Sequence, residues 1–151
     1  MFKKVVSVLL ALLTIGVVVY ALGPRVEFNS IHEPLDSKWL STPLIEMDSL
    51  IEVREALVTN MKPDNEARII WHDSIGVSTG ISVVYLHGFS ASQEEGDPIH
   101  REVAKRYEAN LYLSRLHDHG RSDSMSFKDI TPQDLIDSAS EAIDIGSRLG
   151  D

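Results

Sequence analysis

The sequence predicts an α/β domain with a mainly parallel sheet and flanking helices, preceded by one transmembrane helix. Three observations lead to this fold class. An uncharged apolar run covers Val5 to Leu22. The run from Ile81 to Leu86 is apolar almost throughout, as in a strand covered on both faces. Strand and helix patterns then alternate as far as the last residue, and such alternation is typical of a parallel sheet.

The N-terminal run is long enough to cross a bilayer. As a helix, residues 5–22 would span roughly 27 Å, and Lys3 and Lys4 precede them. A cleavable signal has a shorter apolar region of about 7–15 residues, so a retained anchor is favoured and a cleaved signal stays the alternative. We therefore expect residues 1–23 to be an anchor or signal segment in contact with the lipid bilayer. The lysine pair places the body outside the cytoplasm.

Residues 24–40 lack clear periodicity and are expected to form a tether to a domain over 41–151. Ser41 or Thr42 is expected to cap the first helix of that domain, and Pro43 suits its first turn. The helix ends near 60–63. Its apolar face is expected to hold Leu44, Met47, Leu50, Ile51, Leu57, Val58 and Met61.

The central part of the chain predicts strands and a helix in alternation. Strands are expected over 67–72 and 81–86, where β-branched and aromatic residues gather, and over 109–116, which continues the alternation. A helix is expected over 98–107. This order is that of a sheet built from βαβ units.

The last segment carries the clearest helix start. Thr131 is placed as N-cap, Pro132 at the first helical position and Asp134 three residues after the cap. Gly150 suits the end of this helix. In a βαβ series such a helix leads to another strand, so we expect a complete relative to continue after Asp151 into an apolar strand and a serine elbow. The chain ending at Asp151 is then expected to be a poorly soluble fragment.

Composition excludes several classes of partner. The net charge of −9 argues against a nucleic-acid or anionic-lipid surface, because both would repel the chain. The absence of cysteine excludes a disulfide framework and a thiolate metal site. No cofactor is implied.

The strongest chemical signal is His87-Gly88-Phe89, directly after the predicted strand over 81–86. A glycine there lets the backbone turn sharply and present an N–H group to a ligand. Here the sequence resembles the α/β-hydrolase superfamily. The stretch Tyr85 to Ser92 looks like the loop after the third strand of those enzymes, and the resemblance implies that the N–H of Phe89 belongs to an oxyanion hole.

A second match lies at the expected distance along the chain. The stretch Leu116 to Ser122, with His119 and Gly120, is similar to the G-H-G-x-S loop after the fourth strand of that family. Two departures stand out: Asp118 replaces the glycine before the histidine, and Arg115 stands where an aspartate often ends the strand. The resemblance covers roughly residues 40 to 151 and is specific for fold rather than substrate.

What the resemblance implies is a membrane-anchored serine hydrolase that acts on carboxylic esters or similar acyl bonds. In this chemistry a serine attacks the carbonyl, a histidine takes its proton and a carboxylate orients the histidine. We expect the nucleophile, acid and base after Asp151, so this chain alone is expected to be inactive. The alternative is a non-catalytic, membrane-anchored binding or scaffold domain with the same fold.

Three other candidates are rejected. Residues 76–80 match G-x-S-x-G literally, but a nucleophile elbow follows a strand and opens a helix, whereas here the strand follows Ser78. Ser90 lacks the final glycine and lies in the oxyanion loop. The pair His117 and His119 has a spacing found in zinc sites, yet no third histidine supports it, so no metal is expected.

Overall fold

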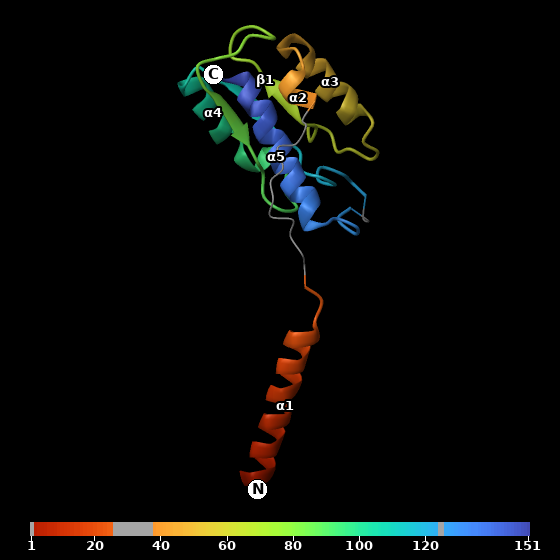
Figure 1. Ribbon diagram of the computed structural model, residues 1–151. Helices are drawn as coiled ribbons and strands as arrows, with labels where there is room; N and C mark the ends of the chain where they lie inside the picture. The colour runs from red at the N-terminus through yellow and green to blue at the C-terminus, as the bar shows by residue number, and fades with distance from the viewer. Residues whose placement is uncertain (1, 26–37, 124–125) are drawn as a thin grey trace.

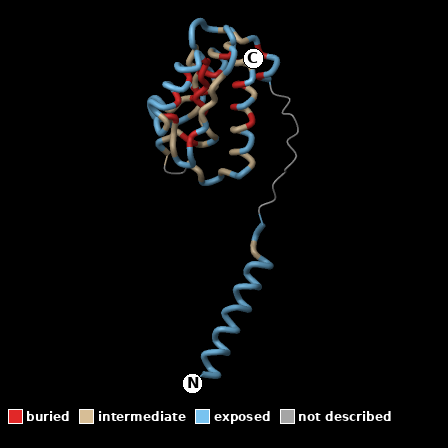
Figure 2. Tube along the Cα trace, turned by 90° about the vertical axis from the view of Figure 1, so that its left-hand side faces the viewer, coloured by how far each residue is buried: buried red, intermediate tan, exposed pale blue. Residues whose placement is uncertain are grey.

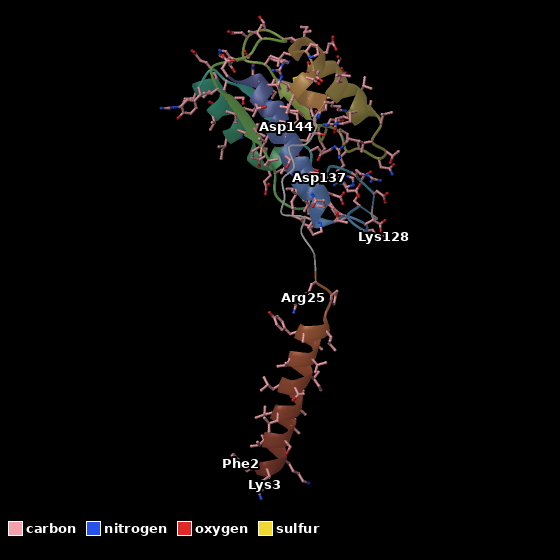
Figure 3. All side chains as sticks on the ribbon, in the orientation of Figure 1. Phe2, Lys3, Arg25, Lys128, Asp137 and Asp144 are labelled. Atoms are coloured by element: carbon pink, nitrogen blue, oxygen red, sulfur yellow. The ribbon has the colours of Figure 1, made fainter. Side chains whose placement is uncertain are left out.

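The computed structural model describes residues 2–25, 38–123 and 126–151. The helix α1, Phe2–Leu22, has no buried residue and lies away from the folded body (Figures 1 and 2). It has a mean hydropathy of 2.7 and is long and apolar enough to cross a membrane. Charged residues lie beyond both ends of its apolar run, with Lys3 at one end and Arg25 after the other (Figure 3). The prediction of one N-terminal helix long and apolar enough to span a membrane is therefore confirmed.

The body is built from a three-stranded sheet and helices on both of its faces (Figure 1). In chain order its elements are α2 (Lys38–Ser41), α3 (Leu44–Ala56), β1 (Arg68–Ile70), β2 (Ser82–Tyr85), the short 3₁₀ helix η1 (Gln93–Gly96), α4 (Ile99–Arg106), β3 (Asn110–Leu113) and α5 (Pro132–Leu149). All strands and helices predicted beyond residue 41 are present; α5 has the predicted boundaries and the other elements are shorter than predicted.

The sheet is mixed, which corrects the predicted mainly parallel arrangement. Its strand order is β1-β3-β2. β2 is parallel to β3, with Val83 beside Leu111, but β1 is antiparallel to β3, with Ile69 beside Tyr112. The hydrophobic run of a strand does not reveal its direction, so the sequence could not distinguish the two arrangements.

β3 is the central and fully buried strand, whereas β2 lies at an edge. Whether a further strand, expected after Asp151, covers this edge of β2 stays a prediction. A single parallel bridge does join Thr79, just before β2, to Gly150, just after α5. The Thr79 N–H donates to the Leu149 carbonyl (3.1 Å) and the Asp151 N–H donates to the Thr79 carbonyl (3.0 Å).

Alternating side chains of the strands point into two separate cores. On one face Ile69 and Tyr112 pack with α2, α3 and α5. On the other face Leu111 and Leu113 pack against α4. Figure 2 shows the buried segments gathered between these layers. The alternation follows from strand geometry, in which successive side chains point to opposite faces.

α5 begins as the sequence predicts. The Thr131 hydroxyl accepts a hydrogen bond from the Asp134 N–H (3.2 Å), and the Asp134 carboxylate accepts one from the Thr131 N–H (2.8 Å). This reciprocal pair is a capping box. Farther along, Gly146 lies directly on Val84 of β2, and a Cβ at Gly146 would overlap that side chain. The glycine therefore allows α5 to lie close to the sheet.

The start of α3 differs from the prediction. Its N-cap is Pro43, and no side chain caps it. The hydroxyls of Ser41 and Thr42 instead donate to the Lys38 carbonyl, because Ser41 is the last residue of α2 and Thr42 follows it directly. α3 also ends at Ala56, earlier than the expected 60–63, and its buried residues are Met47, Ile51 and Glu55.

The folded body begins within the range assigned to the tether. Trp39 of α2 is only 1% exposed and belongs to the core between α3 and α5. The Lys38 ammonium lies 4.6 Å from the centre of its ring. The rest of the predicted tether, residues 26–37, lies outside the described residues.

Candidate functional site

The two loops identified from the sequence follow neighbouring parallel strands. Residues 86–92 follow β2 and residues 114–122 follow β3. Because β2 and β3 are parallel and in direct contact, both loops leave the same edge of the sheet. The structure therefore brings the two sequence matches together.

His87 connects the first loop to the second. It is 5% exposed, and its Nε2 accepts a hydrogen bond from the Leu116 backbone N–H (3.2 Å). Its Nδ1 lies 3.0 Å from the Gly88 carbonyl, so Nδ1 carries the proton. Accepting through Nε2 requires a neutral imidazole, and burial lowers the pKa of His87 from its usual value of 6.5.

His119 connects the second loop back to the first loop. It is fully buried, and its Nε2 accepts a hydrogen bond from the Ser90 backbone N–H (3.0 Å). Its Nδ1 donates to the His117 carbonyl (2.7 Å). Desolvation lowers the pKa of His119 as well, and the neutral form again fits both contacts.

Two phenylalanines pack around these imidazoles. Phe89 contacts His119 edge to face, with ring centroids 5.4 Å apart, and Phe127 lies 4.6 Å from His119. The rings of His87 and His119 are 5.0 Å apart. The side chain of Phe89 is nevertheless 65% exposed, so one side of it faces solvent.

Phe89 presents its backbone at the turn between β2 and η1. The neighbouring amides are occupied: Gly88 N–H donates to the Glu95 carboxylate (2.9 Å) and Ser90 N–H donates to His119. For the Phe89 N–H, residues 2–25, 38–123 and 126–151 offer no acceptor. An unpaired N–H in a fixed turn is the kind of donor that stabilises an oxyanion.

The departures from the family motif have structural explanations. Asp118 has φ of +56°, the left-handed region in which glycine carries no penalty and aspartate is tolerated. Its carboxylate also accepts a hydrogen bond from Arg121 (2.7 Å). Gly120 follows with φ of +73°. The turn therefore keeps its left-handed residues although Asp118 replaces glycine.

Arg115 is used for an ion pair that the sequence did not indicate. Its Nε donates to the Glu55 carboxylate at 2.5 Å, and that carboxylate also accepts the Ala67 N–H (3.1 Å). Glu55 is 3% exposed. The sequence does hold one signal for the burial of Glu55. Glu55 continues the four-residue spacing of Met47 and Ile51 along the buried face of α3.

A cavity of about 520 Å³ lies beside the second loop, between α2, α3, α5 and the end of β3. One wall carries the acidic residues Asp134, Asp137 and Glu141 of α5, and Figure 3 labels Asp137 on this helix. Arg54 and Arg115 also line this cavity. Arg54 is bound to Glu141 and to the Tyr112 hydroxyl, whereas the carboxylate of Asp137 accepts a hydrogen bond from Gln133.

Neither rejected serine has the surroundings of a nucleophile. Ser78 lies in the irregular segment before β2, and its hydroxyl donates to the Asp151 carboxylate (3.3 Å). Ser90 has φ of +64° and contributes its backbone N–H, not its hydroxyl, to His119. Among the hydrogen bonds of the described residues, neither hydroxyl is paired with an imidazole.

A zinc site at His117 and His119 finds no support in the described part of the chain. No group of three or more potential metal ligands occurs there. The two ring nitrogens of His119 are both engaged with backbone groups. The His117 side chain is 53% exposed and lies near Asp118.

Comparison with protein-family models, with curated proteins and with solved structures finds no match to this chain. Arguments about its function therefore rest on the geometry of the two loops and on the apolar helix α1.

Proposed function

We propose that this chain supplies the oxyanion-stabilising part of a membrane-anchored α/β-hydrolase that acts on carboxylic esters or similar acyl bonds. The single observation that carries the proposal is the Phe89 N–H at the turn after β2, for which the described part of the chain offers no acceptor. Two hydrogen bonds tie its loop to the one after β3. A donor fixed in this way is already oriented when negative charge develops on the carbonyl oxygen.

The pairing of the strands supports the same proposal. The resemblance treats β2 and β3 as the third and fourth strands of the hydrolase sheet, and they are parallel neighbours here. The bridge between Thr79 and Gly150 directs the chain after α5 along the open edge of β2. A serine nucleophile, its base and its acid would come from polypeptide outside the described residues.

The position of the body relative to the membrane is part of the proposal. α1 would hold the protein in the bilayer, and the lysines before its apolar run would remain in the cytoplasm. The body would then work on the opposite side. The competing function, a non-catalytic anchored binding domain, shares the fold and α1 but needs no oxyanion donor.

The donor role is testable without a nucleophile. Full-length chain in detergent micelles would be titrated with methylphosphonate, a tetrahedral anion, while backbone amide resonances are recorded. We expect the largest shift at Phe89 N–H, and Phe89→Ala is expected to retain it because alanine keeps the N–H. Phe89→Pro removes that N–H and is expected to abolish the response. A response spread over surface lysines, or one that survives Phe89→Pro, would refute the donor role.

A further inference from the structure

The two candidate loops are joined by a symmetrical exchange of contacts. His87, in the first loop, accepts from a backbone N–H of the second, Leu116. His119, in the second loop, accepts from a backbone N–H of the first, Ser90. Each imidazole therefore fixes the backbone of the opposite loop, and the two rings are in contact at 5.0 Å.

Both contacts depend on an unprotonated Nε2. In each ring Nδ1 faces a backbone carbonyl, Gly88 for His87 and His117 for His119, so Nδ1 holds the single proton. A second proton on Nε2 would turn the acceptor into a donor facing another N–H group. The hydrogen bond would then become a repulsive contact.

We propose that His87 and His119 form a proton-sensitive latch that positions the Phe89 N–H. With both imidazoles neutral, the loops are joined and Phe89 is held between Gly88 and the anchored Ser90. With either imidazole protonated, its Nε2 hydrogen bond is lost and the loop of Phe89 is released from the loop of His119. The relevance of the latch to acyl transfer rests on the proposed function, whereas the latch itself is measurable without it.

Some charged groups around the two imidazoles favour their protonation, and others oppose it. Glu95 of η1 and Asp118 attract a proton to His87 and His119 respectively, whereas Arg115 opposes protonation of both. His117 also opposes a charge on His119, and each charged imidazole would repel the other. Burial is the largest influence and lowers both pKa values, so release is expected on mild acidification below the ordinary histidine range.

Hydrogen–deuterium exchange of the full-length chain in detergent micelles tests the latch. Protection factors, corrected for the intrinsic exchange rate at each pH, would be measured for the Ser90 and Leu116 amides. We expect each to fall about tenfold or more between about pH 7.5 and about pH 5, since one pKa unit of coupling corresponds to tenfold. The amide of Leu111 in β3 is expected to keep its protection.

Variants separate the latch from a general effect of acid. In His87→Gln/His119→Gln the amide oxygens accept hydrogen bonds at any pH, so protection of Ser90 is expected to become independent of pH. His72→Gln, at an exposed histidine outside the loops, is expected to behave like the parent. His119→Phe keeps a ring but no acceptor, so Ser90 is expected to be unprotected at both pH values.

Protection of Ser90 and Leu116 that is equal at both pH values in the parent would overturn the latch. So would a pH response that persists in the double glutamine variant. If that variant does not fold, nuclear magnetic resonance titration of the parent decides: the imidazole signals of His87 and His119 must titrate together with the loss of amide protection. Separate midpoints would exclude the latch whether or not the protein takes part in ester chemistry.

Discussion

Glu55 of α3 and Arg115 after β3 form an ion pair in which both side chains are largely buried, with 3% and 11% of their surfaces exposed. The pair joins a helix that precedes the sheet to the loop that carries His119. The second guanidinium, Arg54, also contacts Glu55 and binds Glu141 of α5. The network therefore links α3, α5 and the second candidate loop.

Removing Arg115 is expected to be strongly destabilising. In Arg115→Ala the Glu55 carboxylate stays buried and keeps Arg54 as its remaining cation, so the free energy of unfolding is expected to fall by about 3 kcal/mol. Chemical denaturation in detergent, followed by the fluorescence of the tryptophans, measures the loss. Arg68→Ala, in a half-exposed pair with Glu66, is the matched control and is expected to cost less than about 1 kcal/mol. Equal losses in the two variants would contradict a special role for the buried pair.

The same pair predicts how stability depends on acid. Burial raises the pKa of Glu55, but the hydrogen bond and charge of Arg115 outweigh burial and leave this pKa below its usual 4.5. A carboxyl with a lowered folded-state pKa binds fewer protons folded than unfolded. Its stabilisation is therefore complete above about pH 4.5 and is lost as the pH falls through the folded-state pKa. Denaturation of the parent and of Glu55→Gln across this range is expected to show a smaller pH slope in the variant.

Gly146 is expected to tolerate no side chain despite its helical position. In an open helix, alanine in place of glycine would stabilise by about 1 kcal/mol. Here the added methyl group would overlap Val84, so Gly146→Ala is expected to destabilise by about 1–3 kcal/mol. Gly80→Ala, with open space around its Cβ position, is the control. The double variant Gly146→Ala/Val84→Ala is expected to recover part of the loss, and thermal unfolding by circular dichroism provides the comparison.

The sequence predicted the elements and the parallel βαβ unit of β2, α4 and β3, but not the direction of β1. The capping pattern at Thr131 located α5 because its determinants are local, lying within four residues of the chain. The antiparallel direction of β1 depends on how the segment between β1 and β2 crosses the sheet, and no local pattern encodes this. Ser41 and Thr42 failed as caps because α2, which was not predicted, takes their hydroxyls.

The candidate site was predicted in the same partial way. His87, Gly88, His119 and Gly120 were singled out from motifs, and the structure brings both loops to one edge of the sheet. The reciprocal histidine contacts were not foreseen, since they join residues 29 positions apart in the chain. The role of the Phe89 N–H as an oxyanion donor stays a prediction, because it depends on a bound acyl group.

α1 is expected to hold the chain in the membrane with the body outside the cytoplasm. Leu12→Arg places a charge at the middle of the helix, where insertion costs about 2.5–3.5 kcal/mol, and is expected to move protein out of the membrane fraction. Ser30→Arg, beyond α1, is the control. Protease added to intact cells or spheroplasts is expected to digest the body. Recovery of a soluble product that starts near Pro24 would show a cleaved signal instead, and a protected body would reverse the orientation.

The open edge of β2 is expected to promote association of the chain. β2 pairs only with β3 among the described strands, so its other edge presents backbone N–H and C=O groups. Exposed apolar side chains border this strand: Ile81 is 46% exposed and Leu86 is 41% exposed. An edge of this kind is a template for another strand.

A single charge at that edge provides the test. Ile81→Lys is expected to increase the concentration at which the detergent-solubilised chain stays monomeric, because a lysine beside an open edge disfavours pairing between strands. Ile45→Lys, which replaces a more exposed apolar residue on α3, is the matched control and is expected to leave association unchanged. Analytical ultracentrifugation over a concentration series measures both. A parent that is monomeric throughout the series would exclude the β2 edge as an association surface, and equal effects of the two substitutions would assign association to general hydrophobicity instead.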